Sequence, residues 1–209
     1  MLKTFFTIVC TLLLLGFKSP AGAGAFDPST IQKWVVTPSS FMNIEGKSNI
    51  NSFSCSVTEF LSTDTLSYLF NDKMQKQGQF KGQLVVDVKK FDCHQRFITS
   101  DLRRTLKADE NPTMSIRFLT LDKLGKEMEN HAITGLVEIE LAGMIKRYQV
   151  NYTIQTNNSQ LILTGNKTVM FSDFHLKAPS RIAGLIKIEE EIQVHFQLNL
   201  KPIKTSNSI

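Results

Sequence analysis

The sequence predicts an all-β (mainly β), antiparallel domain with one short helix. Apolar and polar residues alternate over many short segments, as at Met114, Ile116 and Phe118, so each strand has one apolar and one polar face. Helical spacing is convincing only at 100–108. About 184 residues follow a predicted leader, a length that suits one core. Many half-buried antiparallel strands with one helix favour a closed barrel or a sandwich.

Residues 1–25 have the parts of a secretory signal peptide. A lysine near the start supplies positive charge, residues 5–17 form a nearly unbroken apolar run, and 21–25 offer small-x-small cleavage sites. The apolar run is short for a permanent membrane anchor. We therefore expect export, with residues 26–209 as a single mature domain; Ala23 marks the other cleavage point.

Two cysteines remain in the mature chain, Cys55 and Cys93, and each ends a Phe-x-Cys triplet. Because an oxidising compartment allows disulfides to persist, we expect them to bond and to join an early strand to a middle one. The closed loop of 39 residues would add roughly 4 kcal/mol of stability. Two separately buried thiols are the alternative. His94 adjoins Cys93, but the other histidines are scattered, so no metal site is predicted.

The first half of the mature chain is predicted to contain strands over 33–36, 41–45, 49–57 and 82–88. Pro38 lies in the turn after the first strand, and Gly46 predicts a bend or bulge after the second. Residues 59–79 have irregular apolar spacing, which indicates a loop or an elaborated edge. The alternation changes phase at residues 89–90, which predicts a second bulge.

The predicted helix begins with Thr99 or Ser100 as its N-cap. Leu102 and Leu106 are spaced i, i+4 and form one buried stripe. The proline of Asn111-Pro112 ends the helical region because it biases the residue before it toward extended geometry.

Further strands follow to the end of the chain, over 114–118, 137–141, 146–153, 160–170 and 192–200. A polar turn at 155–159 separates two of them. The acidic run 189–191 is interpreted as a solvated turn before the last strand, and the polar tail from 201 onward is expected to fray.

The charge balance excludes some partners. The net charge is +5, and removal of the leader with its two lysines leaves 22 basic and 19 acidic residues, or +3. No basic run is interleaved with aromatic residues, so nucleic-acid binding is not expected. Weak, salt-sensitive attraction to an anionic membrane surface remains open. Arg103, Arg104 and Lys107 on the helix are expected to face solvent rather than to hold a phosphate or lipid headgroup.

Catalytic motifs are absent from the sequence. It has no Gly-x-Ser-x-Gly elbow, no His-Glu-x-x-His helix and no glycine-rich phosphate loop. Asp173 and His175 are a close acid and imidazole pair, yet no nucleophile is evident beside them, and a turn or strand-ladder contact is expected instead. An enzyme is therefore not expected, and neither is a cofactor.

Several motifs occur in a characteristic order. They are Trp34 with Ser39-Ser40, Ile44-x-Gly46, Asn49-x-Asn51-x-Phe53, Asn111-Pro112-x-Met114-x-Ile116-x-Phe118, Gly135-x-Val137-x-Ile139-x-Leu141-Ala142-Gly143, and the 168–175 run Thr-Val-Met-Phe-Ser-Asp-Phe-His followed by Pro179 and Gly184. Over residues 33–200 this order resembles the YceI-like family. The paired Phe-x-Cys triplets resemble a secreted, cysteine-bearing branch of Bacteroidetes-type bacteria.

The resemblance implies an extended antiparallel, lipocalin-like barrel of about eight strands with a helix near one end, in a periplasmic or secreted protein. It also implies non-catalytic binding or transport of a long-chain isoprenoid or another apolar lipid in the barrel interior. Barrel-forming relatives leave a homodimer open.

Inward-facing side chains would contact such a lipid, whose transfer from water is driven by buried apolar area at roughly 25 cal/mol per Å². The candidates are Met42, Ile44, Phe53, Leu84, Val86, Met114, Ile116, Phe118, Val137, Ile139, Phe174, Val194 and Phe196. The alternative is that they fill the core, because a closed barrel must pack its interior. A filled barrel would act through its surface, as a stress or accessory factor.

Overall fold

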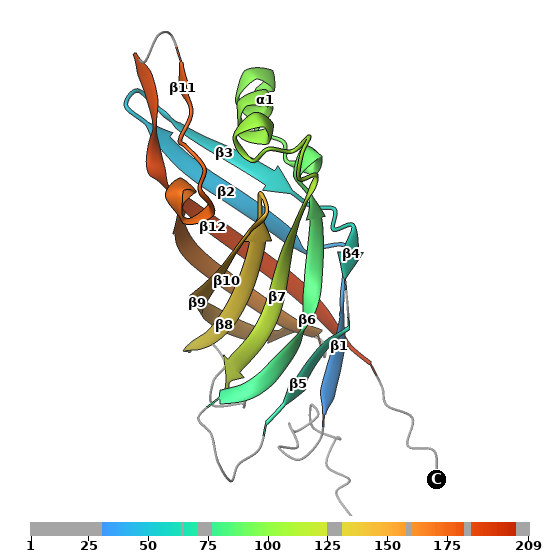
Figure 1. Cartoon of the computed structure of the whole chain (residues 1–209). Coiled ribbons are helices and arrows are strands. Elements are labelled where there is room, and N and C mark those ends of the chain that lie inside the picture. The colour runs from blue at the N-terminus through green and yellow to red at the C-terminus, as the bar shows by residue number, and fades with distance from the viewer. Residues whose placement is uncertain are drawn as a thin grey trace, which may run out of the picture.

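The computed structural model describes residues 31–63, 65–70, 77–124, 131–157, 160–181 and 185–203. The predicted leader at 1–25 and the end of the tail at 204–209 lie outside this part of the chain. The described residues form one strongly twisted sheet, with a single α-helix over one end of the sheet (Figure 1).

The strands are β1 (Gln32–Val36), β2 (Phe41–Ser48), β3 (Ser52–Val57), β4 (Ser62–Thr63), β5 (Leu66–Leu69), β6 (Gln77–Asp87), β7 (Thr113–Asp122), β8 (Ala132–Leu141), β9 (Met144–Asn157), β10 (Gln160–Met170), β11 (Ser180–Arg181) and β12 (Ile186–Pro202). The helices are the α-helix α1 (Arg96–Thr105) and the 3₁₀ helices η1 (Val88–Lys90) and η3 (Phe171–Phe174). In the part of the chain that the structure describes, no helix is long and apolar enough to cross a bilayer.

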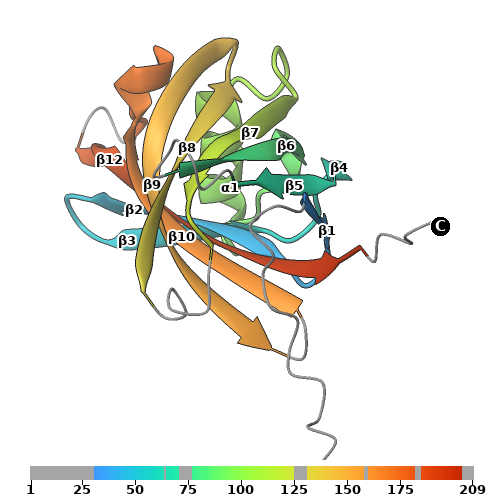
Figure 2. The same cartoon turned by 90° about the horizontal axis from the view of Figure 1, so that it is seen from below.

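The sheet closes on itself as a barrel. Antiparallel pairing runs in the order β1-β5-β6-β7-β8-β9-β10-β12, and β1 pairs with the C-terminal part of β12 to complete a ring of eight strands. Viewed from below, α1 lies behind this ring (Figure 2). The expected antiparallel, lipocalin-like barrel with one helix is therefore confirmed.

β1 and β2 act as one interrupted strand beside β12. Val36 pairs with Leu200, and Phe41 pairs with Gln197 after a break of four residues. The buried Asn199 occupies the break: its backbone N–H donates to Ser40 Oγ at 2.9 Å, and its side chain donates to the Ser39 carbonyl at 2.8 Å. These bonds replace the missing sheet contacts, so the strand continues past Pro38.

The second half of the interrupted strand extends the barrel toward the helix end. β2 pairs with β3, and β3 contacts the segment before α1 through a bridge between Ser56 and Asp92. Beside this bridge Cys55 and Cys93 form a disulfide, with an S–S distance of 2.03 Å. The predicted pairing of the cysteines is confirmed. Cys93 lies in the connection between η1 and α1 rather than in a strand.

The predicted bend at Gly46 is wrong, because β2 continues through this residue. The glycine instead makes room for an aromatic ring, since an added Cβ would collide with the side chain of Phe53. The irregularity lies across the sheet, where the register of β12 shifts between Ile188 and Ile192. Residues 189–191 are thus part of this bulged strand and not a turn before it.

The region 59–79 is more regular than predicted. It contains β4, β5 and the start of β6, and both short strands pair with β6. Residues 89–90 belong to η1 rather than to a bulge. The Asp87 carboxylate accepts a bond from the Lys89 backbone at 2.8 Å and thereby caps this 3₁₀ turn.

The helix begins at Arg96, earlier than predicted, and Thr99 is not its cap. Thr99 is buried inside α1, and its hydroxyl accepts a bond from the Cys93 backbone N–H at 3.0 Å. The Thr99 hydroxyl therefore satisfies the backbone N–H of Cys93 in the turn at the disulfide and does not cap the helix. Leu102 and Leu106 are buried, as their spacing predicted.

The core has two clusters. One surrounds Leu66, Phe80 and Tyr152 in the ring of eight strands, and the other surrounds Met42, Leu102 and the disulfide under α1. Ile116, Ile139, Tyr148 and Phe196 pack against both clusters. The space between the clusters is where the cavity lies.

Candidate functional site

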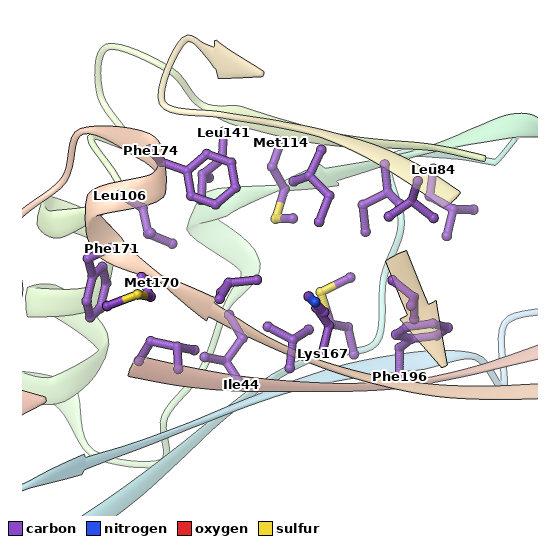
Figure 3. Close-up of a pocket in the computed structure, with 18 of the residues that line it drawn as sticks. Ile44, Leu84, Leu106, Met114, Leu141, Lys167, Met170, Phe171, Phe174 and Phe196 are labelled. Atoms are coloured by element: carbon purple, nitrogen blue, oxygen red, sulfur yellow. The ribbon is translucent and has the colours of Figure 1, made fainter. Parts of the chain in front are cut away.

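An apolar cavity with a volume of about 90 Å³ lies inside the barrel. This is the volume that the centre of a water-sized sphere can occupy. Its wall comes from β2, β6 to β10, β12, α1 and η3, and it includes residues of both core clusters. The cavity is therefore long and narrow, extending from the helix end toward the middle of the barrel (Figure 3).

Most of the residues predicted from alternation line this cavity. They are Met42, Ile44, Leu84, Met114, Ile116, Phe118, Val137, Ile139, Phe174, Val194 and Phe196. All of them except Phe174 lie in strands, where alternation directs one set of side chains into the barrel. Phe174 reaches the cavity from the 3₁₀ helix η3 instead.

Phe53 and Val86 lie elsewhere. Phe53 is in β3, outside the ring of eight strands, and it lines a separate groove beside α1. Val86 is fully buried in the cluster that contains Leu102 and Cys93, away from the cavity wall. Both side chains do point inward, as their parity predicted, but they pack in the core cluster under α1 instead of lining the cavity.

The wall also contains residues that the sequence analysis did not name as site residues. They are Phe60, Leu102, Leu106, Leu141, Val150, Tyr152, Lys167, Val169, Met170, Phe171, Leu176, Ile192 and Leu198. Among those in strands, all except Met170 at the end of β10 have the inward parity of their strand, which was an available signal. Lys167 has this inward parity too, but a lysine within an alternating strand is expected to face water.

α1 and η3 close the helix end of the cavity. Leu102 and Leu106 come from α1 or directly follow it, and Phe171 and Phe174 come from η3 (Figure 3). The Asp173 carboxylate holds η3 in place, since it accepts bonds from the Met170 N–H at 3.1 Å and from the Tyr148 hydroxyl at 2.8 Å.

The pair Asp173 and His175 forms a turn, as expected. His175 is exposed and has a left-handed backbone with φ of 53° directly after η3. Burial, together with the hydrogen bond to Asp173, raises the pKa of Tyr148. The Asp173 carboxylate therefore has a structural role, as the hydrogen-bond acceptor of the Tyr148 hydroxyl.

Aromatic rings narrow the middle of the cavity. Tyr152 and Phe196 meet edge to face with ring centroids 5.6 Å apart. Gly165 lies between them in β10, paired to Tyr152 on one side and to Phe196 on the other, and an added Cβ there would collide with the Phe196 ring. The glycine thus admits two rings where the barrel would otherwise be too narrow.

Two lining residues have polar groups, although no polar atom lines the cavity itself. The Lys167 ammonium lies 5.5 Å from the centroid of the Tyr148 ring, a cation–π contact. The Tyr152 hydroxyl is buried without a hydrogen-bond partner, and burial raises the pKa of this phenol.

A second groove of about 210 Å³ lies at the helix end. It shares Leu102 and Phe171 with the cavity and is also lined by Ile50 and Phe97. Ile50 is 65% exposed and Phe97 72% exposed, and Leu185 at the neighbouring turn is 71% exposed. Apolar side chains in contact with solvent therefore lie at the helix end of the barrel.

Metal chemistry has no evident basis in the described residues, where no group of three His, Cys, Asp or Glu side chains could hold an ion. The polar groove beside α1 contains Lys89, Asp92, Arg103 and Asp109. Lys89 and Asp109 form an ion pair at 2.6 Å, which lowers the pKa of Asp109. Arg103 Nη2 donates to the Phe91 carbonyl at 3.1 Å, while its Nε is buried without a hydrogen-bond partner.

Solved structures with the same fold support the architecture. Burkholderia cenocepacia BcnA is 15% identical, with a TM-score of 0.62, covering 78% of this chain and 98% of its own. A polyisoprenoid binding domain from Saccharophagus degradans, implicated in plant cell wall breakdown, is 12% identical with a TM-score of 0.56, covering 83% and 100%. The Campylobacter jejuni YceI protein is 14% identical with a TM-score of 0.50, covering 70% and 84%.

A comparison with curated proteins found no match. The family model for the YceI-like domain matches residues 34–200, from the buried Trp34 of β1 to the buried Leu200 of β12. The match thus begins and ends on the two strands that close the barrel. The chain belongs to the YceI-like family.

Proposed function

We propose that this protein binds a long apolar lipid, such as a polyisoprenoid, inside its barrel and carries it without catalysis. The observation that supports this most is the cavity itself, whose wall is apolar along nearly its whole length. The polyisoprenoid binding of the Saccharophagus degradans domain supports the same class of ligand.

The physical chemistry of the cavity suits one extended chain. A polyisoprenoid tail makes almost no hydrogen bonds, so its binding depends on apolar area removed from water, at roughly 25 cal/mol per Å². Met42 and Met114 line the wall and can adapt to an irregular chain. The narrow lumen favours a single chain over a broad ring system.

We further propose that the protein works outside the cytoplasm, in the periplasm or after secretion. The Cys55–Cys93 disulfide supports this location, because such bonds persist in oxidising compartments. The predicted signal peptide at 1–25 supports the same location.

The lipid would enter and leave at the helix end, through transient contact with a membrane surface. Ile50, Phe97 and Leu185 are exposed there on three separate tips, formed by the β2–β3 turn, α1 and the β11–β12 turn (Figure 1). The Asn49 side chain joins two of these tips, since it donates to the Leu185 carbonyl and accepts from the Lys187 N–H. Apolar side chains at one end can dip into a bilayer and open a dry route into the cavity.

A binding titration of delipidated protein with geranylgeraniol tests the proposed ligand class. Val194 points into the cavity, and Val194→Phe should fill part of it, whereas Asn166→Phe adds the same ring on the exposed face of the adjacent strand. We expect tight binding by the wild type and by Asn166→Phe, and a loss of about tenfold or more in Val194→Phe.

The filled barrel acting through its surface is the second candidate, and the small cavity volume is the observation that favours it. It predicts that none of the three proteins binds geranylgeraniol. Equal binding by all three would place the lipid on the outer surface and would contradict the proposed site. Thermal melting of each variant shows that a loss of binding is not a loss of fold.

A further inference from the structure

We propose that the groove lined by Ile50, Phe97 and Leu102, which we call the apolar groove, is a second part of the lipid site. It holds the outer segment of an uncharged isoprenoid chain whose inner segment fills the cavity. The inference rests on the proposed function, because it extends the binding site of the same lipid beyond the barrel interior.

The cavity alone is too small for a long isoprenoid chain. Its volume of about 90 Å³ corresponds to about six to nine groups the size of a water molecule, at about 10–15 Å³ for each. One isoprene unit has five carbon atoms, so about two units at most fit without movement of the wall. The rest of a longer chain needs another apolar surface.

The apolar groove is the continuation of the cavity at the helix end. Its volume of about 210 Å³ is more than twice that of the cavity. Leu102 of α1 and Phe171 of η3 line both spaces and therefore form the partition between them. In Figure 3, Phe171 lies at one end of the cavity and Phe196 at the other. Both partition side chains are apolar, so moving them aside breaks no side-chain hydrogen bond.

The wall of the apolar groove suits a hydrocarbon chain. Besides the partition, its apolar lining residues are Ile50, Phe53, Phe97, Ile98, Pro179, Ile186 and Ile188. Ile50 and Phe97 are largely exposed, and a chain in the groove would remove their apolar surface from water. The Phe53 ring packs directly against Gly46 of β2, which leaves no room for a Cβ there. Phe53 thus contacts the lipid from the groove rather than from the cavity.

The charge of the apolar groove favours an uncharged lipid. Asp101 is the one charged side chain among its described lining residues, and it pairs with Arg104 at 3.5 Å. The lining therefore offers no cation to an anionic headgroup. Asn51, Gln95 and Thr105 also line the groove and can hydrogen-bond a terminal hydroxyl.

Hydrogen bonds hold α1 on the face that is turned away from the apolar groove. The Thr99 hydroxyl accepts from the Cys93 N–H at 3.0 Å, and Arg103 donates to the Phe91 carbonyl at 3.1 Å. Thr99 and Arg103 line the polar groove on that face. A chain can therefore enter the apolar groove while these bonds keep α1 in place.

The test measures how affinity depends on chain length. Geraniol has two isoprene units and geranylgeraniol four, and each is titrated into delipidated wild type, Thr105→Trp and the control Ser100→Trp. Thr105 lines the apolar groove, whereas Ser100 is exposed on the opposite face of α1. We expect the wild type and Ser100→Trp to bind geranylgeraniol at least about tenfold more tightly than geraniol. In Thr105→Trp the indole fills the groove, so geraniol should bind as in the wild type and the gain should fall below about threefold.

An unchanged gain in Thr105→Trp would overturn the apolar groove as a lipid site and leave binding in the cavity intact. Equal affinities of the wild type for the two prenols would overturn it as well, because the outer units would then make no contact. Thermal melting checks the fold of each variant, and Asn51→Trp fills the groove from the β2–β3 turn if Thr105→Trp unfolds. Binding of neither prenol by the wild type would contradict the proposed function itself.

Discussion

Single residues set how much space the barrel has. Gly46 and Gly165 each lie opposite an aromatic ring, Phe53 and Phe196, that an added Cβ would strike. The cavity is lined by apolar atoms even at Lys167 and Tyr152, and the buried Tyr152 hydroxyl has no hydrogen-bond partner. A single added carbon atom at either glycine would therefore displace the aromatic ring opposite it.

Replacement of Gly165 by alanine should lower the free energy of unfolding by about 1–3 kcal/mol, because the Phe196 ring must leave its position. Urea unfolding measures the change. The neighbouring Thr164→Ala, on the exposed face of the same strand, should stay within about 0.5 kcal/mol of the wild type. Equal unfolding curves for Gly165→Ala and wild type would show that the ring has room to move.

The three tyrosines of the chain should resist ionisation while the protein is folded. Burial raises the pKa of Tyr68 to about 12, and burial also raises the pKa values of Tyr148 and Tyr152. The folded-state pKa exceeds the ordinary value of 10.0, so this contribution to stability is complete below pH 10 and is lost as the pH rises through about 12. Phenolate absorbance should show no step near pH 10 and should rise with unfolding; a step at pH 10 in folded protein would contradict the burial.

At the scale of elements, short polar contacts join strands that the sequence separates. Asn199 connects β12 to the break between β1 and β2. The disulfide connects β3 to the segment that leads into α1. Both lie where regular sheet pairing stops, so each should contribute strongly to stability.

Ser40→Ala should cost about 1–3 kcal/mol, because it leaves the buried Asn199 N–H without its acceptor. Ser39→Ala is the matched control, since its hydroxyl is exposed and its backbone carbonyl still accepts from Asn199. Denaturant unfolding should place the control near the wild type. Equal losses in both variants would indicate a general effect of the turn.

Replacing both Cys55 and Cys93 by serine should lower the free energy of unfolding by about 2–4 kcal/mol and leave the strand content unchanged. Reduction of the wild type should give the same shift in chemical unfolding, while circular dichroism reports the fold. A variant as stable as the oxidised wild type would show that the bridge adds nothing.

For the molecule as a whole, alternation predicted antiparallel strands and most of the inward residues, but it left a barrel or a sandwich open. The resemblance to the YceI-like family selected the barrel. The start of α1 could not be predicted, since Thr99 resembles a cap but serves Cys93 across the disulfide turn. Phe53 was wrongly predicted to line the cavity, because β3 lies outside the ring of eight strands. The parity of a residue along its strand does not show where that strand lies in the fold. Lys167 was not predicted to line the cavity, because a charged side chain is expected to face water even at an inward position of a strand.

Native mass spectrometry of the protein, purified without detergent from its own organism, tests lipid binding in the barrel most directly. Organic extraction then identifies what is released. We predict one apolar lipid per protein, with a chain that the cavity can hold. A bare protein mass would contradict lipid binding and would leave a filled barrel that acts through its outer surface.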